Sequence, residues 1–431
     1  MKPIEELQNC LYQAAKADKG RRFYSLHDKI YRMDVLREAW RRVKENYGAA
    51  GVDRETIEDI ERDGVEQFLS ELQRQLQTET YRVQCVRRVY IPKRNGGMRP
   101  LGIPTVKDRV VQQAVRLIIE PIFEADFQEF SYGYRPKRSA KQASLEIRKW
   151  LNYGLTSIID VDIDGFFDHI NHNKLLSFVM ERITDGYVIS LIKEWLRAGV
   201  LYLNSMIYPE EGTCQGGVIS PLSANIYLNK LDGWWSELGL NRRDTYNAQM
   251  VRYADDIVIL TDSKETKHIR EVFEFLLSEL DLKLNIEKSR ETDARKGFDF
   301  LSFHYVRRQR DRYGKMVTIF FPSLEAGRRF KHRVGEMASR KVAHLKDERT
   351  LVRELNRFIV GWTSYFNHSN ASETYNHLQS FVEWKFAKFM CFRHHYTKLS
   401  FRHGGFLTCY RYGLVKLTGR ISQAKLPIAV R

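Results

Sequence analysis

Long hydrophobic runs are absent from this chain of 431 residues. No apolar stretch approaches the roughly 20 residues that a membrane-spanning helix requires. The amino terminus is polar and lacks the apolar core of a secretory signal peptide. These absences argue against a membrane protein and against a secreted one. We therefore expect a cytoplasmic protein with no membrane partner.

Cysteine is scarce as well. The five cysteines are odd in number and scattered, which predicts a reducing compartment rather than a disulfide framework. Two of them, Cys391 and Cys409, lie near His394, His395 and His403. Such side chains can ligate zinc, but their spacing matches no common zinc finger. Solvated or phosphate-facing histidines are the favoured interpretation.

Basic residues outnumber acidic residues in only one part of the chain. The net charge is +16, and residues 307–431 hold 25 Lys+Arg against 8 Asp+Glu, while the preceding 306 residues hold 45 against 46. Aromatic residues such as Trp362, Trp384 and Phe392 are interleaved with the basic ones. A solvated basic face usually explains a charge run. A basic region that is also rich in aromatic residues favours nucleic-acid binding.

Two adjacent aspartates interrupt an apolar stretch. Tyr253-Ala254-Asp255-Asp256 has strand-forming residues on both sides, which predicts a β-hairpin with acids at its tip. An ionised carboxylate in such surroundings is costly to desolvate unless a positive charge compensates it. Mg²⁺ suits such a tip because it binds oxygen ligands and leaves room for substrate phosphates. A solvated Asp-Asp turn is the alternative.

A second acidic stretch favours the metal site. Residues 157–168 open as a short apolar strand in which Asp160, Asp162 and Asp164 alternate, so a strand would direct all three toward one face. Two such strands side by side would bring three carboxylates together. Phosphoryl transfer by two metal ions requires that arrangement.

With these two acidic stretches, the chain resembles the reverse transcriptases of the maturase type that group II introns encode. The resemblance covers nearly the whole chain. Its motifs are residues 89–93 (VYIPK), 99–104 (RPLGIP), 132–136 (YGYRP), 162–167 (DIDGFF), 212–222 (GTCQGGVISPL), 253–256 (YADD), 284–289 (LNIEKS), 300–303 (FLSF) and 361–366 (GWTSYF). The ordered series is far more specific than the YADD box alone.

The resemblance implies an α+β fold of the right-hand polymerase type. Its fingers and its palm, an antiparallel sheet backed by helices, would precede an α-helical thumb that the family calls domain X. We expect four regions: an N-terminal helical extension (1–30), fingers (31–155), a palm with the catalytic acids (156–305) and a basic thumb or maturase domain X (306–431).

Local patterns agree with that expectation. Asn95-Gly96 predicts the turn of a hairpin over residues 86–103. Apolar residues at helical spacing predict an amphipathic helix over 269–280 and a second helical stripe over 351–366. The second stripe is most simply the core of a helical bundle.

The resemblance assigns the catalytic acids. Asp162, Asp255 and Asp256 match the metal-binding aspartates of the family's palm, and Ile163 would offer its backbone carbonyl to a metal. The implied cofactor is Mg²⁺ as two ions, with Mn²⁺ as a possible replacement. Asp160 and Asp164 are read as solvent-facing or supporting residues.

Further residues match the substrate site of the family. Lys93 and Arg99 match a fingertip pair that neutralises the incoming triphosphate. Phe166 matches a steric gate, a ring beneath the sugar that excludes a ribose 2′-OH, the group that distinguishes RNA from DNA substrates. Core packing is the alternative for Phe166 or its neighbour Phe167. Gln215 belongs to the loop beneath the nucleotide, and Lys288 to the turn behind the palm.

The chain departs from the family pattern at several positions. Cys214 stands where Pro commonly precedes Gln-Gly, and Ser302 replaces the common Gly of the Phe-Leu-Gly-Phe box. Trp234-Trp235 and residues 242–249 resemble a local insertion. We also expect Arg135 and Lys137 to contact template or primer phosphates.

The predicted activity is RNA-directed DNA polymerisation combined with binding and splicing of intron RNA in group II intron mobility. The implied partners are an RNA template such as group II intron RNA, a DNA or RNA primer, and dNTPs. Two alternatives remain: a domesticated relative in DNA repair or phage defence, and an RNA-binding splicing cofactor with a vestigial polymerase. The sequence holds no His-Asn-His/cysteine-pair endonuclease module, so we expect a primer from elsewhere, and bacterial cytoplasm or nucleoid as the location. Nothing in the sequence predicts the oligomeric state.

Overall fold

The computed structural model describes residues 3–92, 97–202, 205–207, 211–212, 216–262, 264–309, 316–395 and 408–420. The chain divides into two compact units. The first unit comprises Met1–Ser139, Val161–Ile257 and Lys264–Arg290, and the second comprises Ala140–Asp160, Val258–Ser263 and Glu291–Arg431. Each unit is thus assembled from segments that are distant in the sequence.

The helical part of the first unit is organised around α6 (Val106–Glu124), which is buried along most of its length. Thr105 caps this helix, because its side chain accepts a hydrogen bond from the Asp108 N–H at 3.0 Å. Both α1 (Pro3–Ala17) and α3 (Met33–Glu45) pack against α6. The other helices of this unit are α2 (His27–Ile30), α4 (Ile57–Asp63), α5 (Val65–Gln77), the 3₁₀ helix η1 (Phe166–Asp168), α8 (His172–Met180), α9 (Gly186–Arg197), α10 (Ser220–Glu237) and α11 (Thr266–Ser278).

A four-stranded sheet of the first unit has the order β2-β1-β4-β5. Its strands β1 (Val86–Pro92) and β2 (Met98–Ile103) form the predicted antiparallel hairpin, which pairs Arg87 with Ile103 and Ile91 with Arg99. The predicted turn at Asn95-Gly96 lies outside the described residues. The shorter strands are β4 (Val200–Tyr202) and β5 (Ser205–Ile207).

The acid-bearing strands belong to a second four-stranded sheet, of order β6-β7-β3-β8. Its strands are β3 (Ser157–Asp162), β6 (Gln249–Tyr253), β7 (Asp256–Thr261) and β8 (Arg290–Asp293). The sequence correctly predicted β3 and the β6–β7 hairpin with acids at its tip. The predicted amphipathic helix is α11, which buries Ile269, Phe273 and Leu276.

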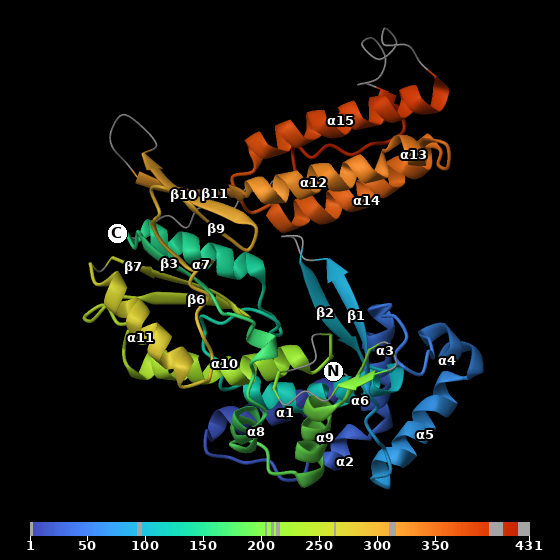
Figure 1. Ribbon diagram of the computed structural model, residues 1–431, viewed down its shortest axis with the longest axis vertical. Coiled ribbons are helices and arrows are strands. Elements are labelled where there is room, and N and C mark those ends of the chain that lie inside the picture. The colour runs from blue at the N-terminus through green and yellow to red at the C-terminus, as the bar shows by residue number, and fades with distance from the viewer. Residues whose placement is uncertain are drawn as a thin grey trace. The chain divides into compact units, whose positions relative to one another are not determined.

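The second unit combines a small sheet with helices. Strands β9 (Phe298–Phe300), β10 (Phe303–Gln309) and β11 (Met316–Pro322) form a sheet of order β11-β10-β9, and α7 (Ala140–Asn152) packs on β10 and β11. The helices α12 (Leu324–Met337), α14 (Glu348–Phe366) and α15 (Ser372–His394) run side by side, with the short α13 (Arg340–Ala343) beside α15 (Figure 1). The predicted stripe over 351–366 is the buried face of α14.

The expected fold class is confirmed: the chain is α+β, with helices, a helical C-terminal part and sheets in which β1 pairs antiparallel with β2 and parallel with β4. Trp235 belongs to the stretch that resembles a local insertion, and the insertion stays a prediction. It lies in α10, is fully buried, packs edge-on against Phe273 and donates to the Ala248 carbonyl at 3.2 Å. It is therefore a core residue. The four region boundaries stay a prediction.

Candidate active site

The turn between β6 and β7 carries Asp255, which is partly buried, and Asp256, which is exposed, opens β7. Burial raises the pKa of Asp255 above its ordinary value, and the negative charge of Asp162 raises it further. The positive charge of Arg99 acts in the opposite direction. Because such charge interactions require proximity, three residues selected from separate motifs lie in one neighbourhood.

Asp162 ends β3 and is held by the segment that follows α11. Its N–H donates to Ser289 Oγ at 3.1 Å, and its carbonyl accepts from the Asn285 N–H at 2.8 Å. Lys288 Nζ donates to Asp162 Oδ2 at 3.3 Å. The sequence linked Lys288 to the substrate site, but it gave no sign that this lysine contacts a catalytic candidate.

The residues after β3 leave the strand. Ile163 is buried and forms an isolated antiparallel bridge with Leu284. Asp164 is exposed, and its N–H donates to the Lys283 carbonyl at 2.9 Å. The alternation of acids therefore continues past the end of the strand, where Asp164 faces solvent as expected.

The acids have the right chemistry for a hard divalent cation, because carboxylate oxygens are the ligands that Mg²⁺ prefers. In the described ranges, however, no three His, Cys, Asp or Glu side chains are grouped closely enough to form a metal site. At Asp162 the Lys288 ammonium occupies the place of a counter-charge. A cation at Asp162 would therefore replace that contact.

Of the residues expected at the triphosphate, only Arg99 can be placed. It is exposed on β2, opposite Ile91 in the hairpin, and its charge acts on Asp255. Lys93 and Gln215, together with the Cys214 departure, lie outside the described residues. The fingertip pair and the loop beneath the nucleotide remain predictions.

Phe166 and Phe167 lie in η1, directly after the left-handed Gly165. Phe166 is buried, Phe167 is partly exposed, and the two rings meet edge-on with their centroids 5.1 Å apart. Phe166 is thus firmly packed. The role of Phe166 as a steric gate stays a prediction. The adjacent Phe167 is the residue against which that role can be tested.

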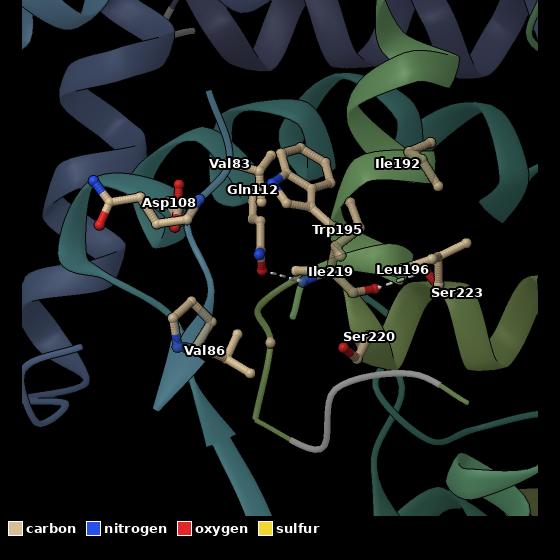
Figure 2. A pocket seen from close by; sticks show the side chains of 14 residues that line it. Val83, Val86, Asp108, Gln112, Ile192, Trp195, Leu196, Ile219, Ser220 and Ser223 are labelled. Atoms are coloured by element: carbon tan, nitrogen blue, oxygen red, sulfur yellow. Dashed lines mark hydrogen bonds between the residues drawn. The ribbon is translucent and has the colours of Figure 1, made fainter. Parts of the chain in front are cut away.

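The segment leading into α10 is anchored by a residue that the sequence patterns did not reveal. Gln112 of α6 is buried, and its Oε1 accepts from the N–H groups of Val218 and Ile219 at 2.8 and 3.4 Å. Figure 2 shows Gln112 directed at Ile219, whose carbonyl in turn accepts from Ser223 Oγ at 3.3 Å. Gln112, Ile219 and Ser223 line a pocket beside the backbone that follows the Gln-Gly motif. Gln112 is one of several polar side chains that α6 buries, with Asp108 and Gln113 among them, so the sequence pattern gave no signal that singled it out.

Arg135 does not have the expected role in phosphate binding. Its side chain is buried, forms an ion pair with Glu124 at 2.7 Å and donates to the carbonyls of Gln128 and Ser131. These partners satisfy the guanidinium inside the protein. Lys137 is exposed, and its contact with template or primer phosphates stays a prediction.

Ser302 follows a turn that explains why a glycine is common there. Leu301 and Ser302 have φ of 48° and 67°, in the left-handed region that favours glycine. The Ser302 hydroxyl accepts from Arg329 Nη2 at 2.8 Å, and its carbonyl accepts from the Ser323 N–H at 2.9 Å. The departure from glycine therefore adds a contact between this turn and α12.

The second unit carries a cluster that we call the Lys–aromatic patch, formed by Lys331 of α12 and Phe381, Trp384, Lys385 and Lys388 of α15. The four residues of α15 are spaced so that they share one helix face. The Phe381 and Trp384 rings are partly exposed, with centroids 5.7 Å apart. Lys388 Nζ lies 4.4 Å from the Trp384 ring, Lys385 Nζ lies 5.2 Å from it, and Lys331 Nζ lies 5.7 Å from the Phe381 ring.

Comparison with known proteins identifies the family. Residues 91–305 match the family described as reverse transcriptase (RNA-dependent DNA polymerase), and residues 328–407 match the group II intron, maturase-specific domain. Protein YkfC of Escherichia coli K12 is 34% identical over 362 residues, which cover 76% of this chain and 94% of YkfC.

The group II intron-encoded protein LtrA of Lactococcus lactis subsp. cremoris is 37% identical over 236 residues, 54% of this chain and 38% of LtrA. A solved partial Cas6-RT-Cas1–Cas2 complex has a TM-score of 0.36 at 23% identity, covering 59% of this chain and 41% of that one. That low similarity adds nothing to the family match.

The fold and the ordered motifs define an RNA-directed DNA polymerase, a nucleotidyltransferase. More narrowly, the chain belongs to the group II intron-encoded reverse transcriptases that carry a maturase domain, a family that acts in intron mobility. Within the described ranges, no helix is both long and apolar enough to cross a membrane.

Proposed function

We propose that this chain extends a primer on an RNA template, with Asp162, Asp255 and Asp256 holding two Mg²⁺ ions. The observation that carries the proposal is that β7, which begins at Asp256 directly after the partly buried Asp255, is the neighbour in its sheet of β3, which ends at Asp162. Two carboxylates near each other in a partly desolvated site favour a divalent counter-ion. Bound ions would supply charge stabilisation for the attacking and leaving oxygens.

The chain's own residues would orient the substrates. The primer 3′-OH releases its proton to solvent as its oxygen forms a bond to the α-phosphorus of the dNTP, the bond from that phosphorus to the bridging oxygen breaks, and pyrophosphate leaves with that oxygen. Arg99, with Lys93, would neutralise the triphosphate and the outgoing pyrophosphate. Phe166 would lie beneath the sugar, and the Gln215 loop beneath the nucleotide. Lys288 would turn from Asp162 toward the substrate phosphates.

The proposed partners are an RNA template such as group II intron RNA, a DNA or RNA primer, and dNTPs. The Lys–aromatic patch supports RNA binding by the second unit. Partly exposed rings can stack on unpaired bases, and lysines beside them can meet the phosphates. We propose fingers, palm and thumb roles for the regions 31–155, 156–305 and 306–431.

Primer extension on a defined RNA template tests the proposal. The wild type should synthesise DNA with dNTPs and Mg²⁺, and Asp255→Asn should lose synthesis, because the amide is a neutral and weaker ligand. Asp164→Asn is the matched control: it alters an exposed aspartate of the same sequence region, and synthesis should persist. DNA synthesis that survives Asp255→Asn would contradict the assignment.

An RNA-binding splicing cofactor with a vestigial polymerase is the second candidate, favoured by the charge of residues 307–431. Folded wild-type protein that binds intron RNA in a salt-sensitive manner, yet makes no DNA, would support it. The intact set of three acids argues for the polymerase.

A further inference from the structure

A fully buried ion pair lies beneath the turn that carries Asp255. Arg252 of β6 and Asp232 of α10 each have 0% of their side chain exposed. Arg252 Nε lies 2.9 Å from one carboxylate oxygen of Asp232 and 3.1 Å from the other. Desolvation offsets most of the attraction within such a pair, so apolar residues of similar volume often stabilise a core equally well. The contribution of this ion pair to folding stability therefore does not by itself explain why it is present.

The other end of the same guanidinium reaches the turn. Arg252 Nη1 donates to the Ala254 carbonyl at 3.2 Å and to Asn225 Oδ1 at 3.0 Å. Ala254 has a φ of 58°, a left-handed conformation that costs a residue other than glycine roughly 1 kcal/mol. The hydrogen bond holds the carbonyl of that strained residue, which directly precedes Asp255.

A third segment supports the turn from another side. The Tyr132 N–H donates to the Arg252 carbonyl at 2.8 Å, and Asn225 Nδ2 donates to the Gly133 carbonyl at 2.8 Å. A Cβ at Gly133 would lie 2.3 Å from Ala254 N, a distance that the backbone could tolerate only by moving. Gly133 therefore permits a close approach of two backbones, and Asn225 connects that segment to Arg252.

We propose that Arg252 is a positioning residue that, held in place by Asp232 and Asn225, fixes the Ala254 carbonyl and thereby orients Asp255 and Asp256 for divalent-cation binding. This inference rests on the proposed polymerase function. The planar guanidinium is essential because one group must satisfy Asp232 with one edge and Asn225 and Ala254 with another. A lysine ammonium lacks that geometry.

The test measures cation binding without catalysis: Mn²⁺ titration of the full-length apoprotein, with free Mn²⁺ followed by electron paramagnetic resonance. Arg252→Lys should weaken Mn²⁺ binding roughly 10- to 100-fold, the usual effect of losing a residue that orients metal ligands. In primer extension it should lower kcat while the KM for primer–template stays within about twofold.

Arg182→Lys is the matched control. Arg182 is also a buried arginine; it pairs with Asp126 at 3.0 Å and donates to the Ala15 carbonyl at 2.8 Å, and none of these partners touches the turn. It should lose comparable stability while Mn²⁺ affinity per folded molecule is retained. If both variants weaken Mn²⁺ binding equally, the effect is general destabilisation and the proposal is wrong.

Gly133→Ala provides a second variant in case Arg252→Lys does not fold. It leaves the ion pair intact but drives a methyl group into Ala254 N, so it should weaken Mn²⁺ binding in a chain whose circular dichroism is unchanged. Wild-type Mn²⁺ affinity in folded Arg252→Lys or Gly133→Ala overturns the positioning role. If Asp255→Asn abolishes binding in that same experiment, the proposed function survives. A wild type that binds no Mn²⁺ overturns both.

Discussion

The ammonium of Lys288 lies 3.3 Å from Oδ2 of Asp162, across 126 positions of sequence. Both side chains are substantially exposed, at 60% and 39%, so the pair contributes at most about 1 kcal/mol to stability. The pair matters for the chemistry of the site because the Lys288 ammonium covers the Asp162 carboxylate, which is a candidate metal ligand.

Replacing Lys288 with Met should therefore tighten Mn²⁺ binding to the nucleotide-free protein by roughly two- to fivefold, because the competing ammonium is gone. The KM for dNTP should rise at the same time if the lysine turns to the phosphates during synthesis. Mn²⁺ titration and steady-state kinetics measure the two effects. Lys283→Met, at an exposed lysine of the same segment, should change neither. Unaltered Mn²⁺ affinity in Lys288→Met would show that the contact does not compete with metal.

Phe166→Ala should increase incorporation of ribonucleotides relative to deoxyribonucleotides by roughly 10- to 100-fold, the range that one steric contact in a pocket provides. Single-nucleotide extension with each dNTP and rNTP measures the ratio. Phe167→Ala is the control, because it removes the adjacent, less buried ring. Equal discrimination by wild type and Phe166→Ala would leave Phe166 as a core residue.

Variants of the Lys–aromatic patch should distinguish the contribution of charge to RNA binding from the contribution of base stacking. Replacing Lys331, Lys385 and Lys388 together with Ala should reduce the slope of log affinity against log salt by roughly 2–3 for intron RNA, about one for each phosphate that a lysine no longer neutralises. Trp384→Ala should weaken binding by about 1–3 kcal/mol and leave that slope unchanged.

Lys267→Ala, at an exposed lysine of α11, is the control for the loss of charge in that experiment. Filter binding over a range of salt concentrations measures both quantities. If the triple variant binds with the wild-type slope, RNA does not contact this face of α12 and α15.

His368 should make the second unit sensitive to acid. It is buried against the rings of Phe303 and Phe320, and neither ring nitrogen has a hydrogen-bond partner among the residues that the structure describes. Burial lowers the pKa of His368 to about 4, and the nearby Lys141 charge contributes in the same direction. Between that value and the ordinary one near 6.5, the unfolded chain binds the extra proton.

This contribution to stability is complete above about pH 6.5 and decreases as the pH falls toward 4. Lowering the pH from 7 to 5 should therefore cost the wild type about 1–2 kcal/mol more than it costs His368→Leu. Urea unfolding of both proteins at the two pH values measures the difference. Equal losses would mean that His368 titrates normally in the folded protein.

Much of the candidate site follows from local sequence. The turn signal of Asn95-Gly96 predicted the β1–β2 hairpin, and helical spacing predicted α11 and α14. The YADD box and the DIDGFF motif located Asp162, Asp255 and Asp256. These features depend on residues within about a dozen positions of one another, so backbone periodicity is sufficient to read them.

The tertiary structure decided which side chains meet. Arg135, which its motif associated with phosphate, is instead neutralised by Glu124 inside the protein. Lys288 reaches Asp162, and Arg252 connects α10 to the turn before Asp255. No periodic pattern encodes these contacts. An ion pair forms only where folding brings distant segments together and removes water, so the sequence by itself determined the strands and the acids they carry, while the packing of α6, α10 and the palm strands determined how those acids are held.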